Sequence, residues 1–269
     1  MAKRRKLPAP PMPSALQAPP PRPGEGNGAT PIDHAAEAGK TVVDWVDERT
    51  SLSGAARWMM FRKVPKGTNW FYTLGSATMF AFLSQAVTGV FLAMYYRPDP
   101  SGGAYESIRH VTNEVFLGQF VRGMHKWGSS VMVILVFLHM GRTFFFGAYK
   151  YPRELNWVIG VVLLILTMTM SFTGYLLPFD QRAYWATIVG VNINGTGPLI
   201  GPYLSDFLRG GGEFGATTLS RFYAIHMLLV PGLLAALIGA HLYLVAKLGT
   251  TAPPWIKAEK NPELRKVDA

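Results

Sequence analysis

The sequence contains no cysteine. This absence excludes structural disulfides, metal sites built on thiolates and any thioether-linked cofactor. Charge is also scarce, because only 16% of the 269 residues are Asp, Glu, Lys or Arg, whereas a soluble domain usually carries about a quarter. Hydrophobic residues make up 49% of the chain, so the composition favours a membrane protein over a soluble one.

The sequence contains four long apolar runs that carry few charged residues. A bilayer core of ~30 Å is crossed by about 20 residues of helix. Four runs reach that length: residues 71–96, 124–146, 157–177 and 223–246. None of them alternates as a membrane strand does, and lipid tolerates only helices and closed barrels. The sequence therefore predicts an all-α integral membrane protein built on a bundle of four transmembrane helices.

The net charge of +10 indicates membrane topology rather than a nucleic-acid partner. If both termini and the loop at 147–156 share one side, that side holds every lysine except Lys126. The loops at 97–122 and 178–222 contain equal numbers of arginines and acidic residues. This positive-inside pattern predicts a multi-pass protein of the cell membrane with both termini in the cytoplasm.

The segments outside the spans divide the chain further. Residues 1–40 are basic and then rich in proline, without the apolar core of a signal peptide, so we expect a disordered cytoplasmic tail. Residues 41–60 mix apolar and charged residues at helical spacing, which predicts an amphipathic helix on the membrane surface. The four-helix domain is expected over residues 61–250, followed by a second cytoplasmic tail over 251–269.

Four histidines lie within the apolar runs, and ionisable residues inside a membrane are by default candidates for function. His125 and His139 are fourteen residues apart. At that spacing they project from nearly the same face of a helix, about 21 Å from one another. His226 and His241 are fifteen residues apart, and a kink at Pro231 is expected to absorb the additional residue.

The second and fourth runs enter the membrane from the same side, so their histidines can pair across the bundle. We expect His125 to face His226 near the outer surface and His139 to face His241 near the inner surface. Two imidazoles in an apolar slot, without a carboxylate or thiolate, suit a haem iron better than zinc. The predicted cofactors are two b-type haems, one for each histidine pair.

Glycines repeat the histidine period. Gly75 and Gly89 in the first run, and Gly160 and Gly174 in the third, are also fourteen residues apart. Residues without a side chain leave room for a flat macrocycle beside the backbone. Basic residues that flank the histidines are candidates for neutralising haem propionates: Arg122, Lys126, Arg142 and Arg221.

Three alternative functions compete with this interpretation. A metal transporter based on histidine would place carboxylates or further polar groups in the spans, which contain no carboxylate. A purely structural scaffold would leave the buried histidines unpaired, at a cost of a few kcal/mol each. A di-haem b-type membrane anchor of another respiratory dehydrogenase is the alternative that stays open.

The motifs around these residues resemble cytochrome b, and specifically the short four-helix form found in b6f-type complexes. The resemblance covers about residues 42–250 and includes "FYTLG", "YPRELNWVIGVVL", "TGYLLPFDQRAYWA" and "LSRFYAIH". The fifteen-residue spacing of the last two histidines is also that of the short form.

The resemblance implies a subunit of a quinol:cytochrome c oxidoreductase, or of an enzyme with a plastocyanin-type acceptor, that is not a complete enzyme alone. It implies a low-potential outer haem, a high-potential inner haem, and quinol oxidation at the outer side coupled to proton translocation. Phe179, Tyr184 and Trp185 in "PFDQRAYW" are expected to line the quinol site. The implied partners are a Rieske iron–sulfur protein, a separate subunit with the remaining helices, a cytochrome c-type subunit and a quinone, in a dimeric complex.

One residue departs from the pattern of the short form. In that form a cysteine in "FYCLG" binds an additional haem beside the inner haem, whereas Thr73 occupies the position here. Both haems are therefore expected to be non-covalent, and no covalently bound haem is expected.

Overall fold

The structure, a computed structural model, describes residues 31–50, 54 and 65–255. Within these residues it is all helical, and no strand is present. The first helix, α1 (Pro31–Thr50), belongs to a separate unit of the chain from all the other elements. Most of the predicted tails, 1–30 and 256–269, lie outside the described residues.

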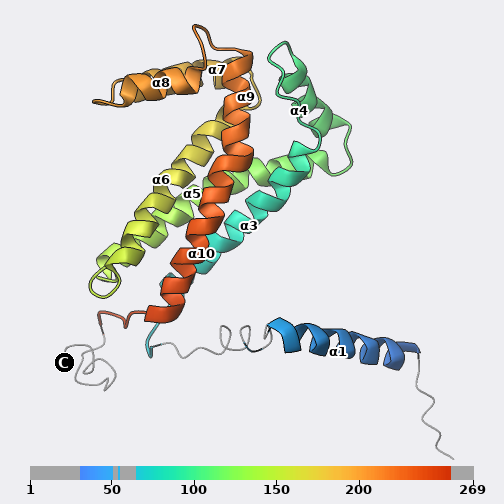
Figure 1. Cartoon of the computed structure of the whole chain (residues 1–269), viewed down its shortest axis with the longest axis vertical. Coiled ribbons are helices and arrows are strands. Elements are labelled where there is room, and N and C mark those ends of the chain that lie inside the picture. The colour runs from blue at the N-terminus through green and yellow to red at the C-terminus, as the bar shows by residue number, and fades with distance from the viewer. Residues whose placement is uncertain (1–30, 51–53, 55–64, 256–269) are drawn as a thin grey trace, which may run out of the picture. The chain divides into compact units, whose positions relative to one another are not determined.

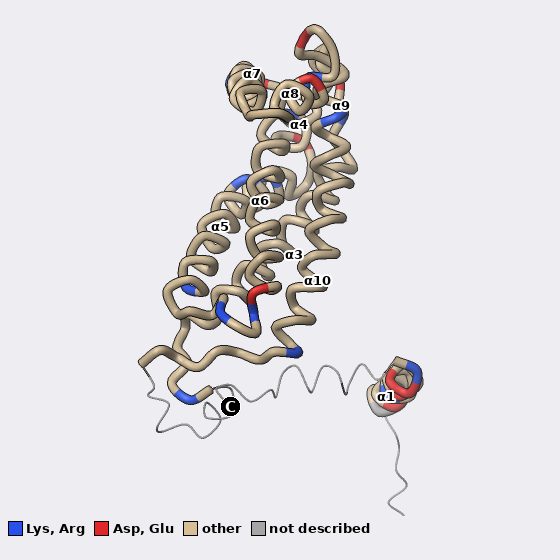
Figure 2. The backbone as a smooth tube through the Cα atoms, turned by 60° about the vertical axis from the view of Figure 1, so that its left-hand side comes forward, with Lys and Arg blue, Asp and Glu red and all other residues tan. Residues whose placement is uncertain are grey.

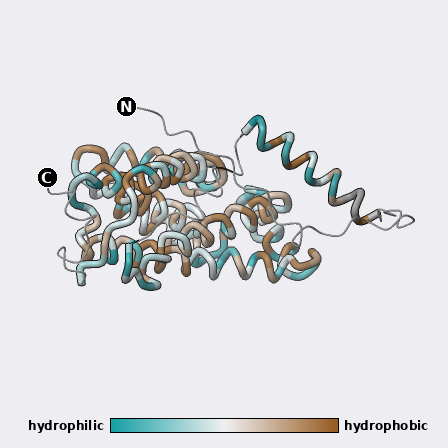
Figure 3. Tube along the Cα trace, turned by 90° about the horizontal axis from the view of Figure 1, so that it is seen from below, coloured by the Kyte–Doolittle hydropathy of each residue, from teal (hydrophilic) through white to brown (hydrophobic). Residues whose placement is uncertain are grey.

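Helix α1 starts earlier than the sequence predicted, at Pro31 rather than at residue 41. Proline suits the first position of a helix, and the alanines that follow are strong helix formers. Hydrophilic and hydrophobic residues alternate along it, as Figure 3 shows. Of the predicted helix over 41–60, the part after Thr50 lies outside the described residues, except for Gly54.

Four helical segments are long and apolar enough to cross a membrane, which confirms the predicted four-span all-α fold. Exposed apolar side chains such as Phe80, Val87 and Phe145 cover them, as lipid contact requires. In chain order the spans are η2 (Trp70–Thr73) with α3 (Leu74–Ala93), α5 (Gly118–Phe145), α6 (Glu154–Leu176), and α9 (Ala216–Ala224) with η3 (Ile225–Leu229) and α10 (Val230–Leu248).

The spans form two packed pairs (Figure 1). Helix α3 packs against α5, and α6 packs against α10. The histidines of the second run therefore lie on one pair and those of the fourth run on the other. Whatever binds between the histidines must lie between the two pairs of helices.

The two ends of the bundle differ. Three shorter helices lie at the end that we call outer: α4 (Gly103–Asn113), α7 (Gln181–Gly195) and α8 (Gly201–Arg209). The loop between α5 and α6 lies at the opposite end, which we call inner (Figure 1). Lys, Arg, Asp and Glu lie towards these two ends, and the middle of the bundle carries none of them in Figure 2. The names follow the predicted topology, which stays a prediction.

The fourth span contains a wide turn at its first histidine. Element η3 is π-helical, and the N–H of Val230 donates to the carbonyl of Ile225 five residues before it. A π turn holds more residues than an α turn, so this turn, which includes His226, takes up the additional residue of the fifteen-residue spacing. The adjustment lies just before Pro231, whereas the sequence placed it at the proline itself.

A buried threonine fixes the connection between α8 and α9. The Thr218 hydroxyl is fully buried, donates to the Arg209 carbonyl (2.5 Å) and accepts from the Gly215 N–H (3.1 Å). Arg221 in turn donates to the carbonyl of Phe207. These bonds satisfy backbone groups at a helix end and a helix start, where intrahelical partners are missing.

Replacing Thr218 by alanine is expected to lower stability by about 1–3 kcal/mol, because buried backbone groups lose their partner. Thr196→Ala is the matched control, since the exposed Thr196 hydroxyl also makes one backbone bond, to Ile193 (2.7 Å). Thermal unfolding in detergent measures both variants. An equal loss in the two would show that the α8–α9 connection does not depend on this hydroxyl.

Candidate functional site: two histidine pairs

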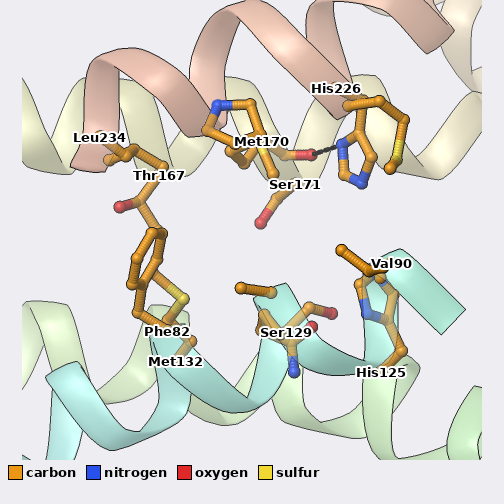
Figure 4. A pocket seen from close by; sticks show the side chains of 15 residues that line it. Phe82, Val90, His125, Ser129, Met132, Thr167, Met170, Ser171, His226 and Leu234 are labelled. Atoms are coloured by element: carbon orange, nitrogen blue, oxygen red, sulfur yellow. Dashed lines mark hydrogen bonds between the residues drawn. The ribbon is translucent and has the colours of Figure 1, made fainter. Parts of the chain in front are cut away.

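Two pairs of histidines face one another across the bundle. The ring centres of His125 on α5 and His226 on η3 are 6.3 Å apart, with the ring planes at 77°. Those of His139 on α5 and His241 on α10 are 6.4 Å apart, at 79°. In Figure 4 the rings of the outer pair come from opposite walls of a cavity and point toward one another. The structure thus brings together the partners that the sequence paired.

The separation within each pair fits one metal ion between the rings. Two imidazoles bonded to one metal from opposite sides, by bonds of about 2 Å, have ring centres roughly 6 Å apart. Among the described residues no group of three or more His, Cys, Asp or Glu that could hold a metal ion is present. A haem would supply the other ligands of its iron and leave two positions for histidine.

Hydrogen bonds orient the outer pair for this role. Nδ1 of His226 donates to the Met170 carbonyl (3.1 Å, dashed in Figure 4). The Thr88 hydroxyl already donates to the Ser84 carbonyl (2.7 Å), so it accepts from Nδ1 of His125 (2.9 Å). Both rings therefore carry their proton on Nδ1, and the lone pair of each Nε2 is free for a metal.

Each histidine ring also packs on a glycine of the neighbouring helix. An added Cβ would lie 3.1 Å from Cε1 of His139 at Gly75, 3.2 Å from His125 at Gly89, 3.8 Å from His241 at Gly160 and 2.5 Å from His226 at Gly174. The sequence suggested that these glycines leave room for a macrocycle. In the structure Gly75, Gly89 and Gly174 leave room for an imidazole as well, whereas a Cβ at Gly160 would make only an ordinary contact.

Two cavities, of about 160 and 290 Å³, contain the outer and the inner pair respectively. The outer cavity is largely apolar, and no Lys, Arg, Asp or Glu is among the described residues that line it. Residues common to both linings form a layer between the cavities: Phe82, Met132, Thr167 and Leu234. This layer lies to one side of the outer histidines in Figure 4.

The inner cavity is lined by several buried polar atoms that make no hydrogen bond to the described residues. Seven of the eight buried side-chain polar atoms without a hydrogen bond in the described part of the chain belong to its lining. They include Nε and Nη2 of Arg142, whose Cζ lies 3.7 Å from the ring centre of Tyr72, and Nε of Arg153. Nδ1 of His241 lies toward the Asn156 backbone but makes no bond of ordinary geometry to a described residue.

Unpaired guanidinium nitrogens in a cavity indicate an anionic ligand. Arg153 donates through Nη2 to the Leu248 carbonyl (3.1 Å), and burial lowers the pKa of its guanidinium. The carboxylates of a haem would supply the missing acceptors. The residues present therefore fit a haem at the inner pair, both through its axial histidines and through its acidic groups.

The four basic residues predicted to meet propionates lie in different surroundings. Of these four, only Arg142 is among the described residues that line either cavity. Arg122 donates to Thr112 (3.3 Å) and Arg221 to Phe207. Lys126 is exposed, and its Nζ lies 5.9 Å from the ring centre of Trp127. The roles of all four stay predictions.

The structure also brings the three predicted quinol-site residues together at the outer end. The rings of Phe179 and Tyr184 are 5.8 Å apart, and those of Tyr184 and Trp185 are 5.3 Å apart. Phe179 has a left-handed backbone (φ 49°), which is uncommon for a residue with a side chain. Asp180 follows it and caps α7 by accepting from the Ala183 N–H (2.8 Å).

Sequence reasoning missed Arg153 and Tyr72 as lining residues of the inner cavity. The sequence signal for Arg153 is an arginine four residues before the third apolar run, in "YPREL". Tyr72 gives no such signal, because an aromatic residue at the start of a span is usual at a membrane interface.

A four-span helical bundle with two stacked bis-histidine sites is the architecture of a membrane cytochrome of the b type. Comparison with known proteins supports this class. The family described as cytochrome b/b6/petB matches residues 59–249. The menaquinol:cytochrome c reductase cytochrome b subunit of Geobacillus thermodenitrificans is 44% identical over 220 residues, which cover 79% of this chain and 98% of that protein.

Two further relatives agree. Cytochrome b6 of Heliobacterium modesticaldum (strain ATCC 51547 / Ice1) is 42% identical over 213 residues, covering 78% of this chain and all of that protein (100%). A solved chain of a hyperthermophilic respiratory Complex III has a TM-score of 0.72 and 31% identity. The match covers 82% of this chain but spans only 59% of the solved one. The chain belongs to the cytochrome b/b6 family.

A glycine that packs against a histidine ring is expected to be necessary for haem binding, and two glycine-to-alanine substitutions test this. Gly174→Ala places a Cβ 2.5 Å from His226, so the ring must move and the outer site is expected to lose its haem. Gly239→Ala on α10 is the control, since nothing lies within 4 Å of its added Cβ and it lines neither cavity. Alanine favours a helix over glycine, so neither change weakens the helix that carries it. Reduced-minus-oxidised spectra measure the outcome, and full haem content in both variants would contradict it.

Proposed function

We propose that this chain is the di-haem cytochrome b subunit of a quinol-oxidising complex of the cytochrome bc or b6f type, in the cytoplasmic membrane. The observation that carries the proposal is the pair of imidazole rings 6.3 Å apart at the outer level, repeated at 6.4 Å at the inner level. A b haem held at each pair supplies one-electron redox chemistry. Two such sites stacked in one bundle define a route for electrons between the two sides of the membrane.

The residues of the chain have distinct parts in this proposal. His125 and His226 would hold the iron of the outer haem and His139 and His241 that of the inner haem, and Met170 and Thr88 keep the outer two in the ligating tautomer. Arg142 and Arg153 would neutralise the acidic groups of the inner haem, because their unpaired nitrogens line that cavity. Both haems are non-covalent, since no cysteine is available for a thioether.

The outer end provides one part of a quinol site. Phe179, Tyr184 and Trp185 form a connected aromatic group there, which suits a flat quinol ring. The match spans 59% of the solved Complex III chain, and the proposal includes a separate subunit for the remaining helices. The names of the relatives support a quinol donor and a cytochrome c-type partner. A Rieske protein, a dimeric complex, proton translocation and cytoplasmic termini complete the proposal.

The number of haems tests the proposal directly. The purified complex is expected to contain two acid-extractable b haems per copy of this chain, by pyridine haemochrome assay. His139→Leu is expected to remove the inner haem and spare the outer one, because His139 belongs to the inner pair. His110→Leu, on the exposed histidine that pairs with Glu114 (2.8 Å), is the control and should keep both. An absence of haem, or loss of both haems from a folded variant, would end the proposal.

The positive charge of Arg153 is expected to raise the midpoint potential of the inner haem. A nearby cation stabilises an added electron, by about 1–2 kcal/mol at ~10 Å and an effective dielectric constant of about 20, which corresponds to some tens of millivolts. Arg153→Gln should therefore lower the midpoint potential of the inner haem. Arg109→Gln, on an exposed residue paired with Glu106 (2.9 Å), is the control. Equal potentials in the two variants on redox titration would show that Arg153 does not face the haem.

A further inference from the structure

A tyrosine after the first span bonds to the end of the third span. Tyr96 lies just beyond the end of α3 (Ala93), and its hydroxyl donates to the carbonyl of Leu177 (2.6 Å) across 81 residues of chain. Leu177 is the last residue before "PFDQ" and caps the C-terminus of α6. Carbonyls at a helix C-terminus lack partners within the helix, and the next residue, Pro178, has no N–H. Tyr96 supplies the missing donor.

The Tyr96 hydroxyl is held in the donor form. Its ring lies 5.3 Å from the ring of Tyr223 on α9, and it packs against the buried cluster that includes Leu176 and Phe222. Burial, and secondarily the neighbouring Tyr223 phenol, raises the pKa of Tyr96 above its ordinary value. A phenol that keeps its proton at every physiological pH donates this bond continuously.

The turn that Tyr96 holds is a strained one. The N–H of Phe179 donates to the Leu176 carbonyl (2.8 Å), and the backbone of Phe179 is left-handed (φ 49°). A residue with a side chain persists in this conformation only where its surroundings determine it. On one side Asp180 anchors the turn to α7, through the N–H of Ala183. On the other side, the bond from Tyr96 anchors it to the end of the first span.

We propose that Tyr96 is a positioning residue for the outer quinol site: by holding the Leu177 carbonyl, it fixes the turn that presents Phe179 beside Tyr184. This inference rests on the proposed function. It assigns a role to a residue outside the aromatic group that is expected to meet the quinol. Tyr96 holds the turn through the Leu177 carbonyl, so it acts through the backbone.

Both partners of this bond lie near residues of the outer histidine site. Gly174, on which the ring of His226 packs, lies one helical turn before Leu177 on α6. Tyr223, the ring neighbour of Tyr96, lies one helical turn before His226. One tyrosine thus joins the ends of three spans at the level where the proposed quinol site meets the outer histidine pair.

The test replaces Tyr96 by phenylalanine in the whole complex, which removes the hydroxyl and keeps the ring. KM for a soluble quinol is expected to rise about threefold to tenfold, the range of one ordinary hydrogen bond. We expect kcat to stay within about twofold, because the change affects where the quinol binds more than the reaction itself. Haem content is expected to stay at the wild-type value.

Tyr223→Phe is the matched control, since it removes the neighbouring phenol and leaves the bond from Tyr96 to Leu177 in place. It is expected to keep the wild-type KM. An unchanged KM in Tyr96→Phe, or an equal rise in the control, would overturn the role of Tyr96. Loss of haem from Tyr96→Phe would also overturn it, because the hydroxyl would then support the fold rather than the quinol site.

The two proposals fail in different ways. If the unaltered complex oxidises quinol and Tyr96→Phe does so with the same KM, only the role of Tyr96 is refuted. If the unaltered complex contains both haems but oxidises no quinol, the proposed function is refuted, and the quinol-site role of Tyr96 with it.

Discussion

The close approach of three histidine rings to glycines is the contact on which the bundle depends. Gly89 on α3 lies against His125 on α5, and Gly174 on α6 lies against His226 on η3. A side chain at either of these glycines would force the histidine ring to shift. The glycines therefore set both the distance between paired helices and the direction of the rings. In lipid, where helices gain little from the hydrophobic effect, such small-residue contacts are a main source of packing energy.

The wide turn η3 follows from the same constraint. His226 and His241 must meet two partners that are fourteen residues apart on α5, yet they are fifteen apart in the sequence. In a regular α-helix the additional residue would rotate one ring away from its partner by about 100°. A π turn that contains His226 removes this mismatch where it arises. Both ring separations are then nearly equal, 6.3 and 6.4 Å.

The features of the fold and the site that could be predicted are those that appear in the sequence as a regular spacing or a biased composition. Span positions follow from hydropathy, and the pairing of His125 with His226 follows from spacing and direction. What could not be predicted has no local pattern. The bond from Tyr96 to Leu177 joins residues 81 positions apart, and Arg153 reaches the inner cavity from a polar loop. The π turn was missed because Pro231 is a visible helix breaker, whereas a wide turn before it leaves no mark in the sequence.

The two cavities differ in a way that bears on the direction of electron flow. Arg142 and Arg153 line the inner cavity with unpaired nitrogens, whereas no Lys, Arg, Asp or Glu lines the outer one among the described residues. An added electron is stabilised by nearby cations and destabilised by an apolar surrounding. The inner site should therefore hold an electron more tightly than the outer site. The resemblance to cytochrome b implied the same order of potentials, but the charges of the inner cavity give it an independent physical cause. Under the proposed function, an electron that enters at the aromatic group of the outer end would move inward, toward these two arginines.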